Sequence, residues 1–296
     1  MIVGRPDVAP APQVLGRQLY ENAHHPPQLL VIRAFRPCRR WPRRGKTALF
    51  AKGDHVEVDE QAGIGNELLT SLPSNVQITL LPYLRRVEIP FRTVLHTSGH
   101  PITAVFFVER GYASMLAGLR NGDAAEVGMI GREGMVGLSV ILEADSSPLE
   151  ALMQAKGIVL RLDADVFRKA LAEYPQFRRL MLRYAMAFHM QVSMTAACNG
   201  HHLIEQRLAR WLLEAHDRAE ADELPMTHEF LATMLGVRRA GITVAAGALQ
   251  KAGFIRYEQG KIKIVEVQGL EAAACECHSV VRREFTRLLG PLGVGA

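Results

Sequence analysis

The sequence predicts an α+β protein, and three patterns carry this prediction. Between Val87 and about Leu162, short β-prone segments alternate with glycine, Asn-Gly and Ser-Pro signals, which is typical of a small antiparallel barrel or sandwich. From Pro175 the chain continues as a long, uninterrupted helical run. Nearer the C-terminus, two helical segments meet at Gly236 and precede two short strands. The expected order is barrel, long helix, and a C-terminal domain of helices and strands.

Length and composition limit the class of protein. The chain has 296 residues, enough for about two domains, and 48% of them are hydrophobic. No apolar run approaches the roughly 20 residues that span a bilayer, and the first residues lack the basic and apolar regions of a secretion signal. The four cysteines are scattered and too few for a disulfide scaffold. We therefore expect a cytoplasmic protein.

The N-terminal segment differs from the body in charge. Residues 1–52 hold ten Lys or Arg and two acidic residues, a net charge of +8, so the rest of the chain carries −3 of the total of +5. The segment is also rich in proline and has no sustained period. We expect residues 1–60 to form a disordered basic tail. Its basic stretch could touch phosphate backbones non-specifically, and a solvated extension without a partner is the alternative.

The body begins with helices and continues with strands. In "NELLTSLPSNVQITLLPYLRRVEI" (66–89), leucines and valines recur at steps of three and four residues, and Pro73 fits a turn between two short helices. Asn121-Gly122 between apolar segments is a two-residue hairpin signal. An acidic N-cap candidate, Asp163, begins the next helix. We assign residues 61–174 to the barrel region.

The run over residues 175–200 predicts one helix with a heptad seam. The seam steps by three and four residues over about two heptads. This spacing favours a helix that pairs with its own copy, and a core helix packed on the barrel is the alternative. The predicted dimer seam consists of Leu182, Ala185, His189, Val192 and Ala196.

Residues 201–269 predict a winged helix-turn-helix. After an amphipathic helix built around Trp211, Thr227 can cap a short helix, and Gly236 supplies the left-handed residue that ends it. A second helix then runs to Lys251, which completes two helices joined by a glycine-containing turn. Two strands around Gln259-Gly260 form the wing. Residues 270–296 are assigned to a C-terminal helix and tail.

The charge of this region predicts DNA binding. Between Arg238 and Lys263 there are six cations and one anion. In helix-turn-helix proteins the early residues of the second helix reach base edges, and arginine suits a bidentate contact with guanine. A helix-turn-helix used only for protein contacts is the alternative. The expected DNA-contacting residues are Arg238, Arg239, Ala240, Thr243, Val244, Thr227, Lys261 and Lys263.

This order of elements resembles the Crp/Fnr family of bacterial transcription regulators. The resemblance covers about Asn66 to Glu266, and three stretches carry it: "RLARWLLE" (207–214), "THEFLATMLGVRRAGITVAAGALQKAGFI" (227–255) and "GREGMVGL" (131–138). It implies a jelly-roll barrel like that of cyclic-nucleotide-binding domains, a dimerisation helix and a Crp-type winged helix-turn-helix that binds DNA. It also implies a homodimer on an inverted repeat of double-stranded DNA, with RNA polymerase as a partner.

The resemblance implies an effector pocket at Gly131, Arg132, Glu133, Gly134 and Ser193. Relatives that bind cyclic AMP use a Gly-Glu pair on the ribose and an Arg-Ser pair on the phosphate. Here Leu149-Glu150 stands where that Arg-Ser pair would be, and glutamate repels phosphate. The Thr-Ser pair that meets adenine is half lost, because Val192 precedes Ser193. We expect a degenerate pocket that does not take cyclic AMP, no certain cofactor, and an unidentified small-molecule effector or none.

The reading helix also departs from the cyclic-AMP receptor. Arg239 matches that receptor's guanine-reading arginine, but Ala240 and Val244 stand where it has a glutamate and a second arginine. Both can offer only apolar contacts, for example to a thymine methyl group. We therefore expect a different target sequence.

Two further interpretations remain. Cys275, Cys277 and His278 could join Cys198 and either His201 or His202 in a metal site, but C-x-C-H is not a usual zinc spacing, so we expect no metal. No paired carboxylates, nucleophile motif or P-loop indicates an enzyme. The alternative function is a ligand-binding regulatory module that acts through a protein partner and carries a vestigial helix-turn-helix.

Overall fold

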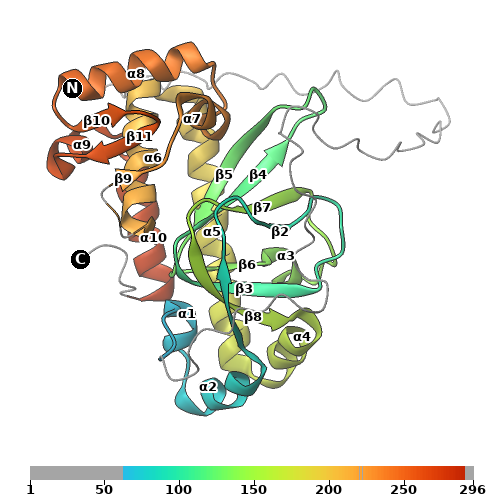
Figure 1. Cartoon of the computed structure of the whole chain (residues 1–296). Helices are drawn as coiled ribbons and strands as arrows, with labels where there is room; N and C mark the ends of the chain where they lie inside the picture. Colours follow the sequence, from blue (N-terminus) through green and yellow to red (C-terminus); the bar gives the residue numbers. More distant parts are fainter. Residues whose placement is uncertain (1–62, 220, 222, 291–296) are drawn as a thin grey trace, which may run out of the picture. The chain divides into compact units, whose positions relative to one another are not determined.

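A computed structural model describes residues 63–290, apart from 220 and 222. The expected tail of residues 1–60 lies outside the described residues. The described chain runs from two short helices through two four-stranded sheets into the long helix α5, and then through five helices and a small third sheet (Figure 1).

The predicted helices at the start of the body are short. They are α1 (Glu67–Thr70) and α2 (Ser74–Leu80), followed by a 3-10 turn at Leu81–Tyr83. Asn66 caps α1, because its side-chain oxygen accepts a hydrogen bond from the Leu69 amide at 3.1 Å. Pro73 occupies the N-cap position of α2, as its place in the sequence predicts. Both helices bury leucine and valine side chains in the barrel core.

The barrel region consists of two antiparallel sheets. Their strand orders are β1-β8-β3-β6 and β2-β7-β4-β5, so that neighbours in a sheet are mostly distant in sequence. A short helix, α3 (Leu138–Ile141), lies between β6 and β7. The strands are β1 (Arg85–Ile89), β2 (Val94–His96), β3 (Ala104–Arg110), β4 (Ala113–Gly118), β5 (Ala124–Ile130), β6 (Met135–Val136), β7 (Leu149–Met153) and β8 (Gly157–Asp163).

The hairpin between β4 and β5 is present, but its turn is longer than the Asn-Gly signal predicts. The connection spans residues 119–123, and the Leu119 amide donates to the Asp123 carbonyl at 2.7 Å. Gly122 takes a φ of 92°, and the side-chain oxygen of Asn121 accepts from the Asp123 amide at 3.1 Å. The asparagine therefore organises a five-residue loop instead of forming the first position of a two-residue turn.

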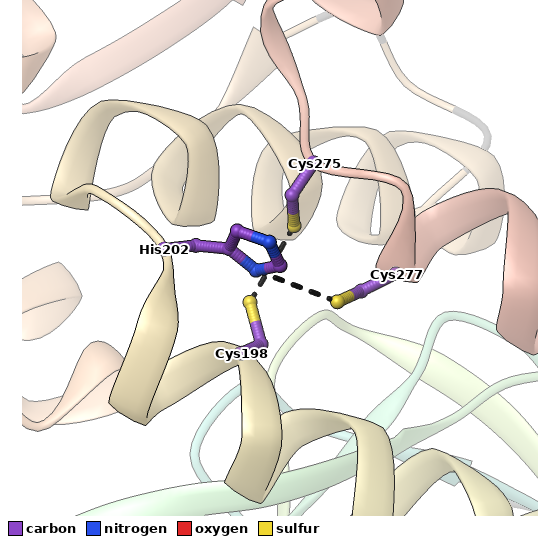
Figure 2. Close-up of side chains that lie close together, drawn as sticks. All are labelled: Cys198, His202, Cys275 and Cys277. Carbon is purple, nitrogen blue, oxygen red and sulfur yellow. Dashed lines mark hydrogen bonds between the residues drawn. The ribbon is translucent and has the colours of Figure 1, made fainter. Parts of the chain in front are cut away.

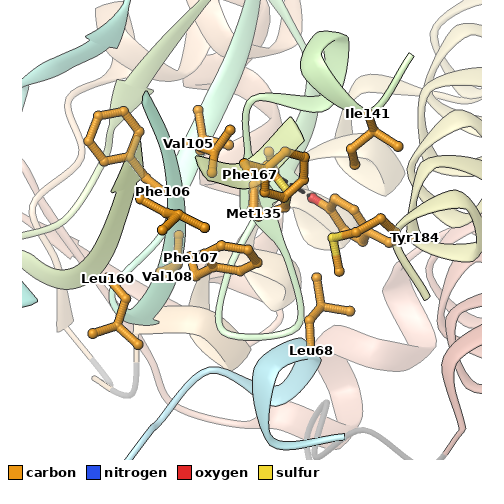
Figure 3. Packing of buried hydrophobic residues seen from close by; sticks show 14 of the residues in the cluster. Leu68, Val105, Phe106, Phe107, Val108, Met135, Ile141, Leu160, Phe167 and Tyr184 are labelled. Carbon is orange, nitrogen blue, oxygen red and sulfur yellow. Dashed lines mark hydrogen bonds between the residues drawn. The ribbon is translucent and has the colours of Figure 1, made fainter. Parts of the chain in front are cut away.

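The core of the barrel region is aromatic where helices meet the sheet (Figure 3). Phe167, on α4 (Ala164–Glu173), packs against Phe107 of β3 and edge-on against Phe177 of α5, with ring centroids 6.3 and 5.3 Å apart. All three rings are fully buried, and each such burial stabilises the fold by about 1.5–3 kcal/mol. Asp163 occupies the N-cap position of α4 as expected, but its carboxylate pairs with Arg161 at 2.7 Å instead of capping the helix.

The long helix predicted from Pro175 is α5 (Pro175–His201). One face packs on the barrel region, and Gly128 of β5 permits this approach, since an added Cβ there would lie 2.8 Å from the Phe188 ring. Of the five predicted seam residues, Ala185 is buried, Val192 is half-buried, and Leu182, His189 and Ala196 are exposed. Exposed Met186 lies on the same stretch as Leu182, so the free face of α5 carries apolar side chains.

The C-terminal region contains the predicted winged helix-turn-helix. Its helices are α6 (Ile204–Ala219), α7 (His228–Leu235), α8 (Arg239–Lys251) and α9 (Val267–Ala273), and a further helix, α10 (Cys277–Leu289), packs along α5. The wing strands are β10 (Ile255–Glu258) and β11 (Lys261–Ile264). A third strand, β9 (Glu223–Leu224), pairs with β11, and the sequence pattern did not reveal it. Trp211 and Phe230 lie in the core of this region, with their ring centroids 6.3 Å apart. The predicted α+β fold class is confirmed.

None of the helices within residues 63–290, leaving aside 220 and 222, is long and apolar enough to cross a membrane.

Candidate nucleic-acid interface and effector loop

The turn between α7 and α8 is formed as the sequence predicts. The hydroxyl of Thr227 accepts a hydrogen bond from the Phe230 amide at 3.2 Å and so caps α7. Gly236 ends the helix with a φ of 63°, a left-handed conformation that glycine adopts without a side-chain clash. The Val237 amide then returns to the Ala232 carbonyl at 2.9 Å. This closed turn fixes the direction in which α8 leaves.

Helix α8 divides into a buried and an exposed face. Ile242, Ala245 and Leu249 are buried against α6 and α7. The predicted reading residues are all exposed, and Val244 is 68% exposed despite being apolar. These residues are Arg238, Arg239, Ala240, Thr243 and Val244. The structure therefore places every predicted residue of the second helix on one solvent-facing surface at its N-terminal half.

His228, which the sequence pattern did not reveal, connects the parts of the winged helix-turn-helix. Its ring stacks on Tyr257 of the wing, with centroids 4.2 Å apart, and its Nδ1 lies 3.1 Å from the Thr243 hydroxyl. That hydroxyl itself donates to the Arg239 carbonyl at 3.2 Å, so the histidine donates to it. Burial, together with the charge of Arg239, lowers the pKa of His228. The neutral imidazole thus links the first helix, the reading helix and the wing.

The two lysines of the wing differ in their ion pairing. Gln259 and Gly260 have φ of 48° and 79°, which gives the tight hairpin turn predicted from the sequence. Lys261 and Lys263 are both exposed, but Lys261 Nζ lies 2.5 Å from a carboxylate oxygen of Glu223 on β9. Part of the positive charge assigned to DNA at Lys261 is therefore neutralised within the protein.

The predicted effector loop, residues 131–134, lies between β5 and β6. Glu133 is buried, and its carboxylate accepts hydrogen bonds from Arg218 Nε at 2.7 Å and from the Gly131 amide at 3.1 Å. Arg132 forms an ion pair with Glu67 at 2.8 Å. Ser193 is exposed on α5, where its hydroxyl donates to the His189 carbonyl at 2.9 Å. The two charged groups of the loop are thus engaged by the protein itself.

Close packing explains the glycines of this loop. A Cβ on Gly131 would lie 2.6 Å from the Glu133 carboxylate and 2.7 Å from the Arg218 side chain, and one on Gly134 would lie 2.6 Å from the Tyr184 hydroxyl. These glycines therefore allow α5 and α6 to approach the loop. The Tyr184 hydroxyl donates to the Met135 carbonyl at 2.9 Å, which holds α5 against the same segment.

A buried polar network extends from this loop along α6. The indole Nε1 of Trp211 donates to Glu126 of β5 at 2.9 Å, and the Ser114 hydroxyl donates to the same carboxylate. Burial is the largest cause that raises the pKa of Glu126 to about 7, and the charge of Glu214 adds to it. Arg210 pairs with Glu214 at 2.8 Å within α6. Sequence patterns do not reveal Glu126, because its neighbours Trp211 and Glu214 are far away along the chain.

The cysteine and histidine residues weighed for a metal site lie partly together. Cys198, His202, Cys275 and Cys277 converge at the junction of α5, α6 and α10 (Figure 2). His278 is not part of this group: its Nε2 lies 3.7 Å from Asp217 of α6. His201 is exposed at the end of α5. Cys38 lies outside the described residues.

Comparisons with known proteins agree with this geometry. Residues 206–273 match the Crp-like helix-turn-helix domain. The fold is similar to that of a crp/fnr family protein from Eubacterium rectale ATCC 33656, with a TM-score of 0.58 at 19% sequence identity, covering 70% of this chain and 96% of that one. No curated protein matches the sequence at a significant level.

Two further solved structures share the fold. A CRP/FNR family transcriptional regulator from Thermus thermophilus has a TM-score of 0.55 at 20% identity, covering 64% of this chain and 98% of its own. The c-di-GMP responsive global regulator CLP of Xanthomonas campestris has a TM-score of 0.55 at 16% identity, covering 65% and 99%. The resemblance predicted from the sequence is confirmed: the chain carries a Crp-like DNA-binding helix-turn-helix and has the fold of Crp/Fnr transcription regulators.

Proposed function

We propose that this protein is a sequence-specific transcription regulator that binds an inverted-repeat operator as a homodimer. The observation that carries the proposal is the exposed face of α8 within the Crp-like domain. Its polar and apolar side chains are presented at the N-terminal half of the helix, the part that enters the major groove in such motifs.

The residues of that face, and those of the wing, have separate proposed roles in DNA recognition. Arg239 is exposed in the first turn of α8 and suits a bidentate contact with guanine O6 and N7. Ala240 and Val244 present methyl groups, which suit contact with a thymine methyl. Lys263 on the wing suits a phosphate contact, which positions the protein without reading sequence.

The free face of α5 supports dimerisation through a second copy of the chain. Leu182 and Met186 are each 45% exposed, and together with Leu288 of α10 they form the apolar part of a groove of about 420 Å³. The groove is also lined by Pro175, Arg178, Arg179 and Arg183. Exposed apolar side chains on one long helix are a surface that self-association would bury. An inverted repeat with half-sites one turn of DNA apart requires the two reading helices of the dimer to lie about 34 Å apart.

The effector loop supports regulation by something other than cyclic AMP. The carboxylate that would meet a ribose, Glu133, is buried and bonded to Arg218, and Glu150 stands where a phosphate-binding group is needed. Burial raises the pKa of Glu150, and a carboxyl group there gives a phosphate no positive partner. We propose another, unidentified small molecule as the effector, and a barrel that binds no effector is the alternative. RNA polymerase is the protein partner we propose, in the cytoplasm.

A selection experiment tests the regulator function. Purified full-length protein is incubated with sheared genomic DNA of the source organism, without added ligand, and the retained fragments are sequenced. Enrichment of one inverted repeat is expected for the wild type and for Arg283→Ala, which removes an exposed arginine on α10. Arg239→Ala should enrich the repeat more weakly and with one base position of each half-site relaxed, while still retaining DNA non-specifically. If no repeat is enriched with or without a metabolite extract, sequence-specific binding is refuted.

A further inference from the structure

Three cysteines and one histidine from two distant parts of the chain meet in space. Cys198 is in the last turn of α5 and His202 follows its end, four residues later, so both point to the same side of the helix. Cys275 lies in the connection from α9 to α10 and Cys277 is the first residue of α10, on the other side of the junction (Figure 2). The three cysteines are buried, and His202 is half-buried.

The distances between these side chains fit one tetrahedral metal ion. Cys198 Sγ and Cys275 Sγ are 3.5 Å apart, and Cys277 Sγ is 3.6 Å from His202 Nδ1. All four ligand atoms lie within 4.8 Å of one another. A zinc–sulfur bond of about 2.3 Å sets tetrahedral sulfur atoms about 3.8 Å apart. A four-iron cluster would hold each thiolate on a different iron, which requires a wider separation.

The surroundings of the cluster suit a metal–thiolate centre. His202 directs Nδ1 towards the sulfurs, and its Nε2 lies 3.3 Å from the Glu276 carboxylate, the arrangement that orients a histidine ligand. Three thiolates and a neutral imidazole around Zn²⁺ carry a net charge of −1. Arg207 and Arg210 are buried near the sulfurs of Cys198 and Cys275. The charge of Arg210 is already paired with Glu214, so Arg207 is the cation that offsets the −1 of the centre. The Nε donors of both arginines have no hydrogen-bond partner among the described residues.

We propose that Cys198, His202, Cys275 and Cys277 bind one structural Zn²⁺. Four protein ligands leave no open position, which distinguishes a structural site from a catalytic one. The ion would join the end of α5 to the first residue of α10. Beyond that residue, Val281, Phe285 and Leu289 of α10 are buried in the barrel core cluster with α5. The site therefore fixes α10 beside the helix that carries the proposed dimer surface.

The proposal departs from the expectation of no metal, and the structure shows why. That expectation judged Cys275, Cys277 and His278 by their spacing. His278 instead faces Asp217, and the imidazole of the cluster belongs to His202, 73 residues before Cys275 in the sequence. The matched domain covers residues 206–273, so all four ligands lie outside the part that the Crp-like helix-turn-helix defines: two precede it and two follow it.

The first experiment measures metal content. The untagged full-length protein is purified without chelator, and zinc, iron and copper are quantified per chain by mass spectrometry. About one zinc per chain is expected for the wild type and for two controls, Cys38→Ser and His201→Ala. His202→Ala and Cys277→Ser should lose most of the zinc. The contrast between His201 and His202 separates a ligand from its exposed neighbour.

A second experiment does not depend on the folding of ligand variants. Wild-type protein stripped of metal is titrated with Co²⁺, which should give thiolate-to-cobalt charge transfer and the intense visible bands of tetrahedral coordination, both abolished by Zn²⁺. His202→Cys should keep tetrahedral cobalt with stronger charge transfer. Glu276→Gln should weaken cobalt affinity 10–100-fold while leaving the spectrum tetrahedral. An octahedral spectrum, iron or copper in place of zinc, or a Cys198–Cys275 disulfide in the purified protein would overturn the proposal.

Discussion

The buried carboxyl of Glu126 makes the stability of this protein depend on pH in an unusual direction. Its side chain is enclosed by Ser114, Trp211 and Tyr112, with the charges of Glu214 and Arg210 nearby. Burial raises its pKa from 4.5 to about 7, although the hydrogen bonds from Ser114 and Trp211 oppose the shift. Between these two pKa values the folded state holds a proton that the unfolded chain releases.

The size of the effect follows from that interval. Because the folded-state pKa is the higher one, the contribution of Glu126 to stability is present at low pH and is lost as the pH rises through about 7. At 1.36 kcal/mol for each pKa unit, the interval corresponds to about 3 kcal/mol, most of it between about pH 5 and pH 8. A single carboxyl thus lowers stability over a range in which ordinary carboxylates have finished titrating.

Glu126→Gln tests this reasoning. The amide keeps the size of the side chain, its oxygen can accept from the Trp211 indole, and it does not titrate. The free energy of unfolding can be measured by urea unfolding followed by circular dichroism. From low to high pH, this free energy should change in favour of the variant over the wild type by about 3 kcal/mol. Glu271→Gln, which changes an exposed carboxylate, should follow the wild type. If Glu126→Gln and wild type lose stability in parallel across this range, the assignment to Glu126 is refuted.

Three further predictions concern DNA binding and the effector loop. Arg239→Ala should cost about 1–3 kcal/mol on the operator and relax one base position, which binding assays on operator variants would show; equal loss on random DNA contradicts base reading. Lys263→Ala should reduce the salt slope of binding by about 1, and Lys261→Ala by less, because Lys261 is paired with Glu223; equal slopes in salt titrations contradict this. Arg218→Met leaves Glu133 buried without its ion-pair partner and should destabilise by about 3–5 kcal/mol in urea unfolding, most of which Glu133→Gln in the same chain should restore.

The helix-turn-helix could be predicted from the sequence because its determinants are local. Thr227 caps α7 through an amide three residues away, and Gly236 needs only its own backbone conformation to end the helix. The exposed positions of α8 follow from helical periodicity around Ile242 and Leu249. Each signal lies within one or two helical turns of the structure that it specifies.

The features that sequence patterns missed depend on contacts between distant segments. Glu126 and Trp211 are 85 residues apart, as are Glu133 and Arg218, and Cys198 is 77 residues from Cys275. Spacing rules cannot register such pairs, because only tertiary packing brings them together. The length of the β4–β5 turn was predicted wrongly for a local reason. The Asn121 side chain forms hydrogen bonds within its own loop, and these bonds favour a five-residue loop over a two-residue turn.

Helix α6 physically joins the predicted effector loop to the Crp-like helix-turn-helix. Trp211 and Arg218 are two helical turns apart and so share one face, where they bond to Glu126 and Glu133 respectively. A movement of α6 away from β5 and from the loop that follows it must break both contacts. Breaking the second would leave the Glu133 carboxylate buried without its cation, which costs several kcal/mol unless another donor replaces Arg218.

This requirement defines what an effector at the loop has to supply. A ligand shifts a conformational equilibrium only by the difference in its affinity for the two states. A molecule that brings its own positive or hydrogen-bond-donating group to Glu133 would bind better after Arg218 has left, and would thereby favour a displaced α6. A purely anionic molecule gains nothing from the released carboxylate. The geometry of Glu133 thus argues for an effector with donors facing this loop, whatever other groups it carries.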